Sequence, residues 1–150
     1  FDAVTCRIAA HHFPDPEAFV EEVARVLATD GVFALEDNIA PDEPALDAFL
    51  NRIERLRDPT HVRSYTEPEW LNWLREAGFR IDETVVMTKE IPYEPWVDQQ
   101  AVPDEVRTDL ERAFLEAPEA AHELFEITVD ERGALESFTN LKLLVRAIRS

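Results

Sequence analysis

The chain has 150 residues and a net charge of −17, with 32 acidic residues against 15 basic ones. This length allows one domain with a sizeable core, and the acidity disfavours nucleic-acid binding through a basic patch. No apolar run of about 18 residues predicts a membrane span, and the lone Cys6 excludes an intramolecular disulfide and favours a cytoplasmic protein.

The composition also points to a saline habitat. Abundant Asp and Glu stand beside only two lysines, Lys89 and Lys142, and this balance is typical of proteins from salt-loving organisms. High salt would screen the mutual repulsion of so many carboxylates. The alternative is an acidic protein from an ordinary habitat.

The first third of the chain predicts a strand, a helix and a second strand. Residues 1–6 are typical of a buried strand and residues 7–13 of a loop. Asp15 is placed to cap a helix with Pro16 at its first position, and the segment "ATDG" ends that helix. Residues 32–36 form a second apolar strand, so the two strands should be parallel.

Two further helices are predicted in the middle of the chain. Residues 44–57 carry apolar side chains at helical spacing. The segment "TEPEW" is a capping box in which Thr66 is the N-cap and Glu69 lies three residues on. The helix that it starts should end at Gly78.

The remainder predicts strands around a helical segment. Residues 79–91 are typical of a strand, and residues 92–124 are helical and acidic with several prolines. The end of the chain predicts two or three antiparallel strands with a turn at Arg132 and Gly133. The fold class is therefore α/β, with a sheet that ends in antiparallel strands.

Unusual polar residues follow the first two predicted strands. They lie in "CRIAAHHF" after the first strand and "EDNIAP" after the second. Ligands of parallel sheets bind beyond the carboxyl ends of the strands, so a site is expected in these two loops.

Several segments together resemble the carboxyl-side portion of class I S-adenosylmethionine-dependent methyltransferases, in the UbiE-like group that acts on small molecules. They are the run from "FDAVTCRIAAHHF" to "RVLATDG" and "EDNIAP", then "LNRIERLRDPTHVRSYTEPEW", "AGF" and "LKLLVRAI"; Asp30 replaces the first glycine of the family's "GG". The resemblance implies a partial Rossmann-like sheet with flanking helices. It would hold strands 4 to 7 of the order 3-2-1-4-5-7-6, with strand 7 antiparallel.

The resemblance also implies that residues 1–150 lack the cofactor-binding first half of the domain, and that residues 92–124 are a helical insertion before the closing strands. The family binds S-adenosylmethionine through a glycine-rich turn after its first strand. The chain has only Gly31, Gly78 and Gly133 and no such turn. The intact protein is expected to use S-adenosylmethionine and a small-molecule acceptor, with no nucleic acid or membrane. The chain alone is expected to be inactive.

The same resemblance assigns candidate site residues. Cys6, Arg7 and His11 would contact the cofactor and His12 would be the catalytic base; Asp37, His61, Arg63 and Tyr65 would contact the acceptor. Each residue also has a structural interpretation, as a core residue, a surface charge, a turn former or a loop residue. No metal site is predicted, because a zinc site from His11, His12, His61 and Asp37 would have no ligand pair at helical i, i+4 spacing.

Two other functions are open. The chain could be a non-catalytic half-domain that assembles, as a homodimer, through the unpaired edge of the strand at residues 1–6. It could also be a metal-dependent hydrolase. The acceptor and the atom that is methylated cannot be predicted from these residues.

Overall fold

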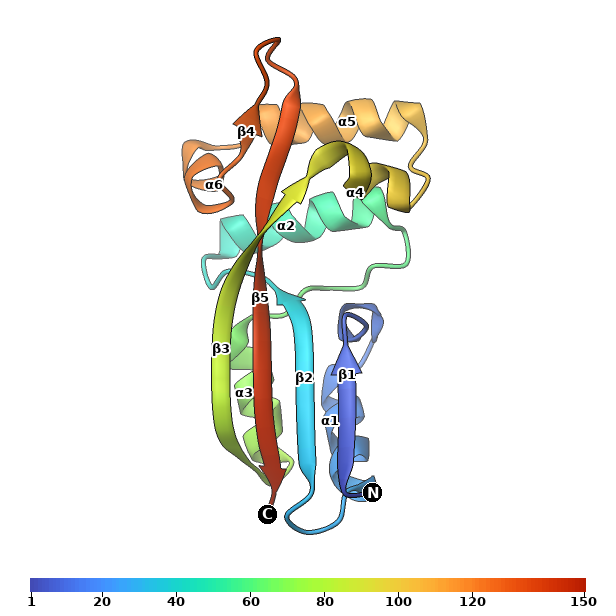
Figure 1. The fold of residues 1–150 in the computed structure, drawn as a ribbon, viewed down its shortest axis with the longest axis vertical. Helices are drawn as coiled ribbons and strands as arrows, with labels where there is room; N and C mark the ends of the chain where they lie inside the picture. Colours follow the sequence, from blue (N-terminus) through green and yellow to red (C-terminus); the bar gives the residue numbers. More distant parts are fainter. The chain divides into compact units, whose positions relative to one another are not determined.

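The computed structural model describes residues 1–150 and divides them into two compact units (Figure 1). Unit 1 comprises Phe1–Pro41, Val62–Met87 and Leu141–Ser150, and unit 2 comprises Asp42–His61 and Thr88–Asn140. Each unit has its own buried core. No helix has the length and apolar character needed to cross a membrane.

The strand order confirms the predicted partial sheet. Strand β1 (Ala3–Arg7) pairs in parallel with β2 (Val32–Ile39), and β5 (Leu135–Arg149) pairs antiparallel with β2. With β3 (Phe79–Pro92) the order is β1-β2-β5-β3. This is the order 4-5-7-6, with its antiparallel strand, that the resemblance implied.

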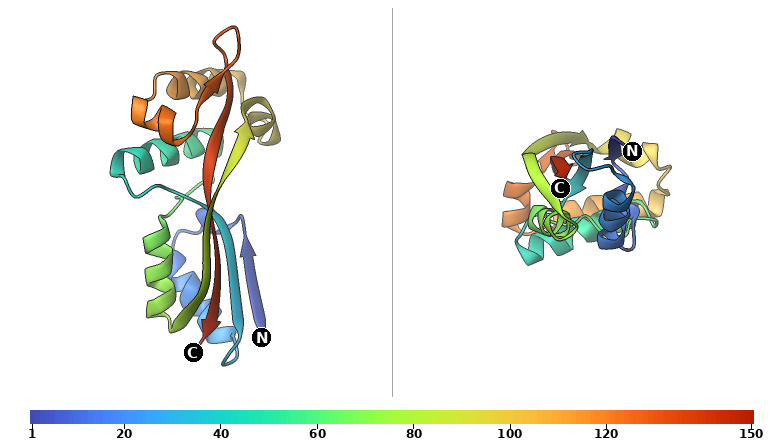
Figure 2. Two further views of the ribbon diagram at one scale, coloured as in Figure 1. Left: turned by 60° about the vertical axis from the view of Figure 1, so that its left-hand side comes forward. Right: turned by 90° about the horizontal axis from the view of Figure 1, so that it is seen from below.

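Two helices of unit 1 cover one face of its sheet (Figure 2). Helix α1 (Pro16–Val26) begins at Asp15, whose side chain accepts a hydrogen bond from the Ala18 amide. Helix α3 (Glu67–Glu76) begins at the predicted Thr66 capping box and ends just before Gly78, whose φ of 84° suits a helix stop. Alternate strand residues point at these helices. The largest fully buried side chains between the two layers are Phe33, Leu35 and Leu143 of the strands and Trp70 and Leu74 of α3.

The end of β2 differs from the prediction. The strand runs to Ile39, three residues beyond the expected end at Glu36, so Asp37 and Asn38 lie in a strand and not in a turn. The reason is β5, whose residues pair with β2 as far as Ile39↔Leu141. A loop was also predicted where Ala10–His12 form a short 3-10 helix, η1.

Unit 2 consists of four helices and the adjoining strand segments. They are α2 (Pro44–Arg57), α4 (Tyr93–Gln99), α5 (Asp104–Leu115) and α6 (Glu119–Leu124). The last three lie in the segment predicted to be helical. The core of unit 2 is rich in aromatic rings, and its buried members include Tyr93, Trp96, Leu110, Phe114 and Phe138.

The closing turn of unit 2 lies where it was predicted. Strand β4 (Thr128–Val129) pairs antiparallel with β5, so two strands form where two or three were expected. Between them Gly133 has a φ of 81°, and the Asp130 carboxylate accepts hydrogen bonds from the amides of Arg132 and Ala134. The side chain of Asp130 thus closes the turn.

Candidate functional site

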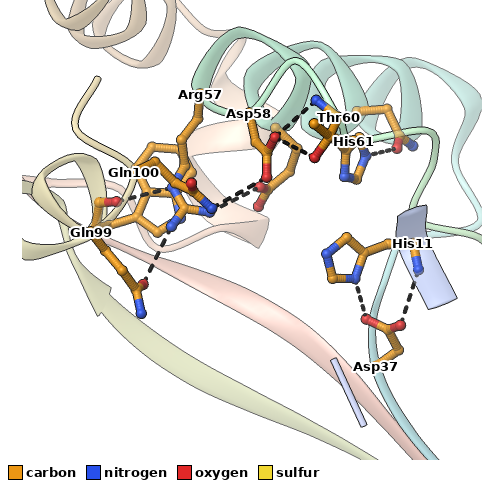
Figure 3. Close-up of polar contacts among 11 residues, drawn as sticks. His11, Asp37, Arg57, Asp58, Thr60, His61, Gln99 and Gln100 are labelled. Carbon is orange, nitrogen blue, oxygen red and sulfur yellow. Dashed lines mark hydrogen bonds and ion pairs between the residues drawn. The ribbon is translucent and has the colours of Figure 1, made fainter. Parts of the chain in front are cut away.

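A buried histidine–aspartate pair lies at the carboxyl ends of β1 and β2 (Figure 3). Because the strands are parallel and Arg7 is in register with Glu36, η1 after β1 comes beside Asp37 of β2. The His11 Nδ1 atom is 2.6 Å from Asp37 Oδ1, and the His11 amide donates to Asp37 Oδ2 at 3.1 Å. The side chain of Asp37 is only 1% exposed and that of His11 13%.

These contacts determine which ring nitrogen of His11 carries a proton. The Asp37 carboxylate also accepts from the Asn38 amide at 2.7 Å, so three donors converge on its two oxygens. In these contacts the oxygens of Asp37 are the acceptors. The His11 Nδ1 therefore carries hydrogen and donates it, which leaves the lone pair of the neutral ring on Nε2.

The backbone of His11 is held as firmly as its ring. The amides of Val62 and Arg63 both donate to the His11 carbonyl oxygen, at 3.0 and 3.1 Å. The Phe13 amide closes η1 by donating to Ala10. Both the ring and the backbone of His11 are thus hydrogen-bonded to neighbouring segments of unit 1.

Cys6 lies at the end of β1 and is 9% exposed. Burial raises the pKa of its thiol, and the negative charge of Asp37 raises that pKa further. The thiol therefore stays protonated at neutral pH. A protonated, buried thiol behaves as a small apolar side chain. An activated nucleophile would instead need a lowered pKa.

Arg7 takes part in a row of charges across the sheet. Its Nε donates to Glu36 Oε2 at 2.9 Å, and the Lys142 ammonium donates to Glu36 Oε1 at 3.3 Å. The bond from Arg7, followed by that from Lys142, lowers the pKa of Glu36. The Arg7 side chain is 74% exposed, so its guanidinium remains accessible to solvent.

His12 follows His11 in η1. Its ring lies 4.2 Å from the His11 ring, between centroids, at an interplanar angle of 45°. The Asp37 carboxylate contacts His11 and Asn38, so Asp37, which was predicted to contact the methyl acceptor, positions His11. Its interpretation as a turn former is wrong, since it lies within β2.

Arg63 and Tyr65 lie in unit 1 on the segment before α3. The Tyr65 ring packs edge-on against Trp70 and Trp73, and its hydroxyl donates to the Phe13 carbonyl at 3.4 Å. Burial raises the pKa of Tyr65. The Arg63 guanidinium lies 5.5 Å from the centre of the Tyr65 ring and pairs with Glu69. Tyr65 is thus a core residue with Arg63 stacked on it.

His61 belongs to a buried polar cluster of unit 2. Its Nε2 lies 2.9 Å from Asn51 Oδ1 (Figure 3), and Asn51 Nδ2 donates to Asp47 Oδ1 at 2.8 Å. His61 is 5% exposed and Asn51 2%. Because the asparagine oxygen accepts, His61 Nε2 carries a hydrogen here.

Asn51 and Glu36 were not predicted as partners of the site residues. A signal for Asn51 exists in the sequence: Asp47, Asn51 and Glu54 recur at i, i+4 and i+7 within an otherwise apolar helix stripe. Polar residues at that spacing indicate a polar strip that needs partners. Glu36 had no comparable signal, because its pairing with Arg7 depends on strand register.

No group of three or more His, Cys, Asp or Glu side chains is arranged to hold a metal ion. Of the four residues considered for zinc, His11 and Asp37 form a hydrogen-bonded pair and His61 bonds to Asn51.

Comparison with known proteins gives consistent matches. Residues 1–84 match the family described as methyltransferase domain. A crystal structure from Bacillus halodurans, described as a methyltransferase, has 39% identity and a TM-score of 0.96, covering 99% of this chain and 70% of that one. The uncharacterized methyltransferase YcgJ of Bacillus subtilis is 36% identical over 99% of this chain, and its solved structure gives a TM-score of 0.95.

A more distant relative has a named reaction. The ubiquinone biosynthesis O-methyltransferase of Xylella fastidiosa is 31% identical over 81% of this chain. The chain spans 59% of the length of YcgJ and 50% of the length of the Xylella protein.

Proposed function

Because the chain belongs to the methyltransferase domain family, we propose that it serves, within the complete polypeptide, in S-adenosylmethionine-dependent methyl transfer to a small-molecule acceptor. The membership agrees with the predicted class I, UbiE-like group and supports S-adenosylmethionine as the cofactor. The cytoplasmic location inferred from the lone Cys6 remains an expectation.

One observation supports a specific role for this chain. The His11–Asp37 pair lies at the carboxyl ends of adjacent parallel strands, where sheets of this type bind ligands. Asp37 holds the imidazole with Nε2 as the basic nitrogen. We therefore assign the role of general base to His11, in place of His12, with Asp37 as its positioning residue.

The proposed reaction is an O-methylation, in line with the name of the Xylella relative. S-adenosylmethionine, when bound, supplies a methyl group on a sulfonium. His11 Nε2 would accept the proton of the acceptor hydroxyl, and Asp37 would stabilise the protonated imidazole through the contact at Nδ1.

The residues present do not make a complete cofactor site. None of Gly31, Gly78 and Gly133 follows β1 or β2, so no glycine turn approaches a cofactor in this chain. Strand β1 ends the sheet order, and Phe1 is 79% exposed. We propose that the rest of the methyltransferase sheet pairs with this edge and supplies the turn, while Cys6 and Arg7 line the near side.

The acceptor side remains a proposal for three predicted residues. Arg63 is the strongest, because its guanidinium is partly exposed beside the aromatic ring of Tyr65. Tyr65 and His61 are buried, so we assign them a structural role and not direct contact with the acceptor.

Calorimetry tests the assignment. The complete polypeptide should bind S-adenosylhomocysteine in buffers of high ionic strength, whereas residues 1–150 alone should bind it far more weakly. Absence of binding by the complete, folded polypeptide would refute the methyltransferase proposal.

A non-catalytic half-domain is the second candidate, favoured by the same open edge of β1. The complete polypeptide should then not bind the cofactor, and residues 1–150 should not be monomeric in light scattering. Cofactor binding by the complete polypeptide, or a monomeric chain at high concentration, would refute this alternative.

A further inference from the structure

The outer edge of β3 has the features of an interface. β3 lies at the opposite end of the strand order from β1, and β5 is its only neighbour in the sheet, so its other edge has no partner strand in the chain. The strand is 14 residues long. Such a long edge presents a row of amide and carbonyl groups that can pair with another strand.

The middle of this edge is apolar and exposed. Val85, Val86 and Met87 are 36%, 44% and 42% exposed, although neighbouring side chains of a strand point to opposite faces. Both faces of the strand are therefore uncovered at this point. Water contact of three consecutive apolar residues is unfavourable, and it would be relieved by a strand laid beside them.

Charges of opposite sign flank the apolar centre. Glu83 lies two residues before Val85 and Lys89 two residues after Met87. Neither Glu83 nor Lys89 forms an ion pair within the chain. Lys89 is one of only two lysines in the chain, whose other basic residues are arginines.

We propose that β3 pairs antiparallel with β3 of a second copy of the chain, with Val86 on the two-fold axis. This register places Glu83 opposite Lys89 and Val85 opposite Met87 on one face. Thr84 then faces Thr88 on the other face. The two-fold axis repeats each of these pairs, and opposite charges or apolar groups directly across strands are favourable.

Neighbouring registers lack this match. An axis at Val85 places Lys89 opposite Ile81 and Met87 opposite Glu83. An axis at Met87 places Lys89 opposite Val85. Each alternative sets a charge against an apolar side chain, so the sequence of β3 favours the register centred on Val86.

The large negative charge of the chain opposes its association with a second copy. Two chains of charge −17 repel each other, and salt reduces this repulsion because the Debye length is only about 8 Å at physiological ionic strength. The dimer should therefore tighten as salt rises. The inference does not depend on the proposed reaction.

Cysteine cross-linking tests the register in the complete natural polypeptide. Val86→Cys should form an intermolecular disulfide on mild oxidation, because residue 86 faces its own copy across the axis. Val85→Cys is the matched control and should not cross-link, since it lies diagonally from its copy; adding Met87→Cys to it should restore the bond. Equal cross-linking of the two single variants, or none in any variant, would overturn the proposal.

Sedimentation equilibrium tests the charge match. The unmodified protein should be a dimer, and Lys89→Glu should weaken the dimer about tenfold or more, because two attractive pairs become repulsive. The exchange Glu83→Lys with Lys89→Glu keeps the net charge and should restore dimerisation. A monomeric parent protein, or failure of the exchange variant to dimerise while its circular dichroism is unchanged, would overturn the proposal.

Discussion

At the residue scale, hydrogen bonds fix the orientation of buried polar side chains. The Asp37 carboxylate has three donors and Tyr93 donates its hydroxyl to the Arg107 carbonyl at 2.8 Å. A buried polar group without a partner costs about 1–3 kcal/mol, so such contacts fix one geometry. In the candidate site this geometry is the direction of the His11 ring.

The first prediction concerns His11. In the complete polypeptide, His11→Gln should lower kcat/KM for methylation of the acceptor by about 10²-fold or more, because the proposed general base is lost. His12→Gln, the matched control, should keep most of this activity. Equal losses of kcat/KM in the two variants would contradict the assignment.

Because Asp37 positions His11, we expect Asp37→Asn, its neutral isostere, to lose both stability and activity. Asp37→Asn has a single acceptor oxygen for three donors, so its amide nitrogen must face at least one of them. We expect about 1–3 kcal/mol less stability in urea unfolding, together with lower kcat. Unchanged stability would show that the carboxylate is not needed.

The raised pKa of the Tyr93 hydroxyl predicts that the protein loses stability at alkaline pH. Burial raises its pKa from 10.0 to about 12. The folded state thus favours the neutral phenol, so this contribution is complete below pH 10 and is lost as the pH rises towards 12. The full difference is roughly 2–3 kcal/mol.

An ultraviolet titration measures this shift, because the chain has only two tyrosines. The higher of the two midpoints should vanish in Tyr93→Phe, and Tyr65→Phe should leave it in place. If both tyrosines of the folded protein titrate near pH 10, the buried hydroxyl of Tyr93 is not held as described.

Residue identities alone could not reveal which side chains meet. His11 was predicted to lie near the site, but its partner Asp37 is 26 residues away and was expected in the loop after the second strand. Their contact depends on the register of β1 with β2 and on the extension of β2 alongside β5. His61 and Asn51 meet because the loop after α2 folds back onto that helix. Secondary-structure propensities of single residues do not predict such a contact.

At the scale of elements, one arginine joins two helices of unit 2. The Arg57 Nε at the end of α2 donates to the Trp96 carbonyl of α4 at 3.0 Å, and its guanidinium lies 4.7 Å from the Trp96 ring centre (Figure 3). Only 12% of the Arg57 side chain is exposed. The planar guanidinium can stack and donate at once, which an ammonium cannot.

We therefore predict that Arg57→Ala lowers the free energy of unfolding by about 2–3 kcal/mol, from the lost charged hydrogen bond and the lost cation–π contact. Arg57→Lys should recover less than half of this. Arg52→Ala, on the exposed side of the same helix, should stay within about 0.5 kcal/mol of the parent in urea unfolding. Similar losses for Arg57→Ala and Arg52→Ala would contradict the proposed link between the helices.

Elements with local signals were predictable. The caps at Asp15 and Thr66 start their helices as predicted, since a capping bond spans only three residues. Helix α2 has the predicted bounds. The end of β2 was missed because polar residues such as Asp37 and Asn38 favour turns unless a neighbouring strand pairs with them.

At the scale of the whole molecule, the charge of −17 should make stability depend on salt. Raising KCl from low concentration to about 1 M at pH 7 should raise the free energy of unfolding by on the order of 1 kcal/mol or more, because the repulsion is screened. Chemical denaturation at each salt concentration measures this. The same salt step should matter less closer to the isoelectric point of about 4.5. Stability that falls with salt would contradict the halophile hypothesis.

The position of β5 also bears on how the protein is made. Residues Leu141–Ser150 belong to unit 1 and lie between β2 and β3 in the strand order, although they follow both strands in the chain. During translation the edge of β2 that pairs with β5 therefore stays bare until β5 has left the ribosome. Nascent chains of this protein should accordingly depend on holdase chaperones until β5 has emerged.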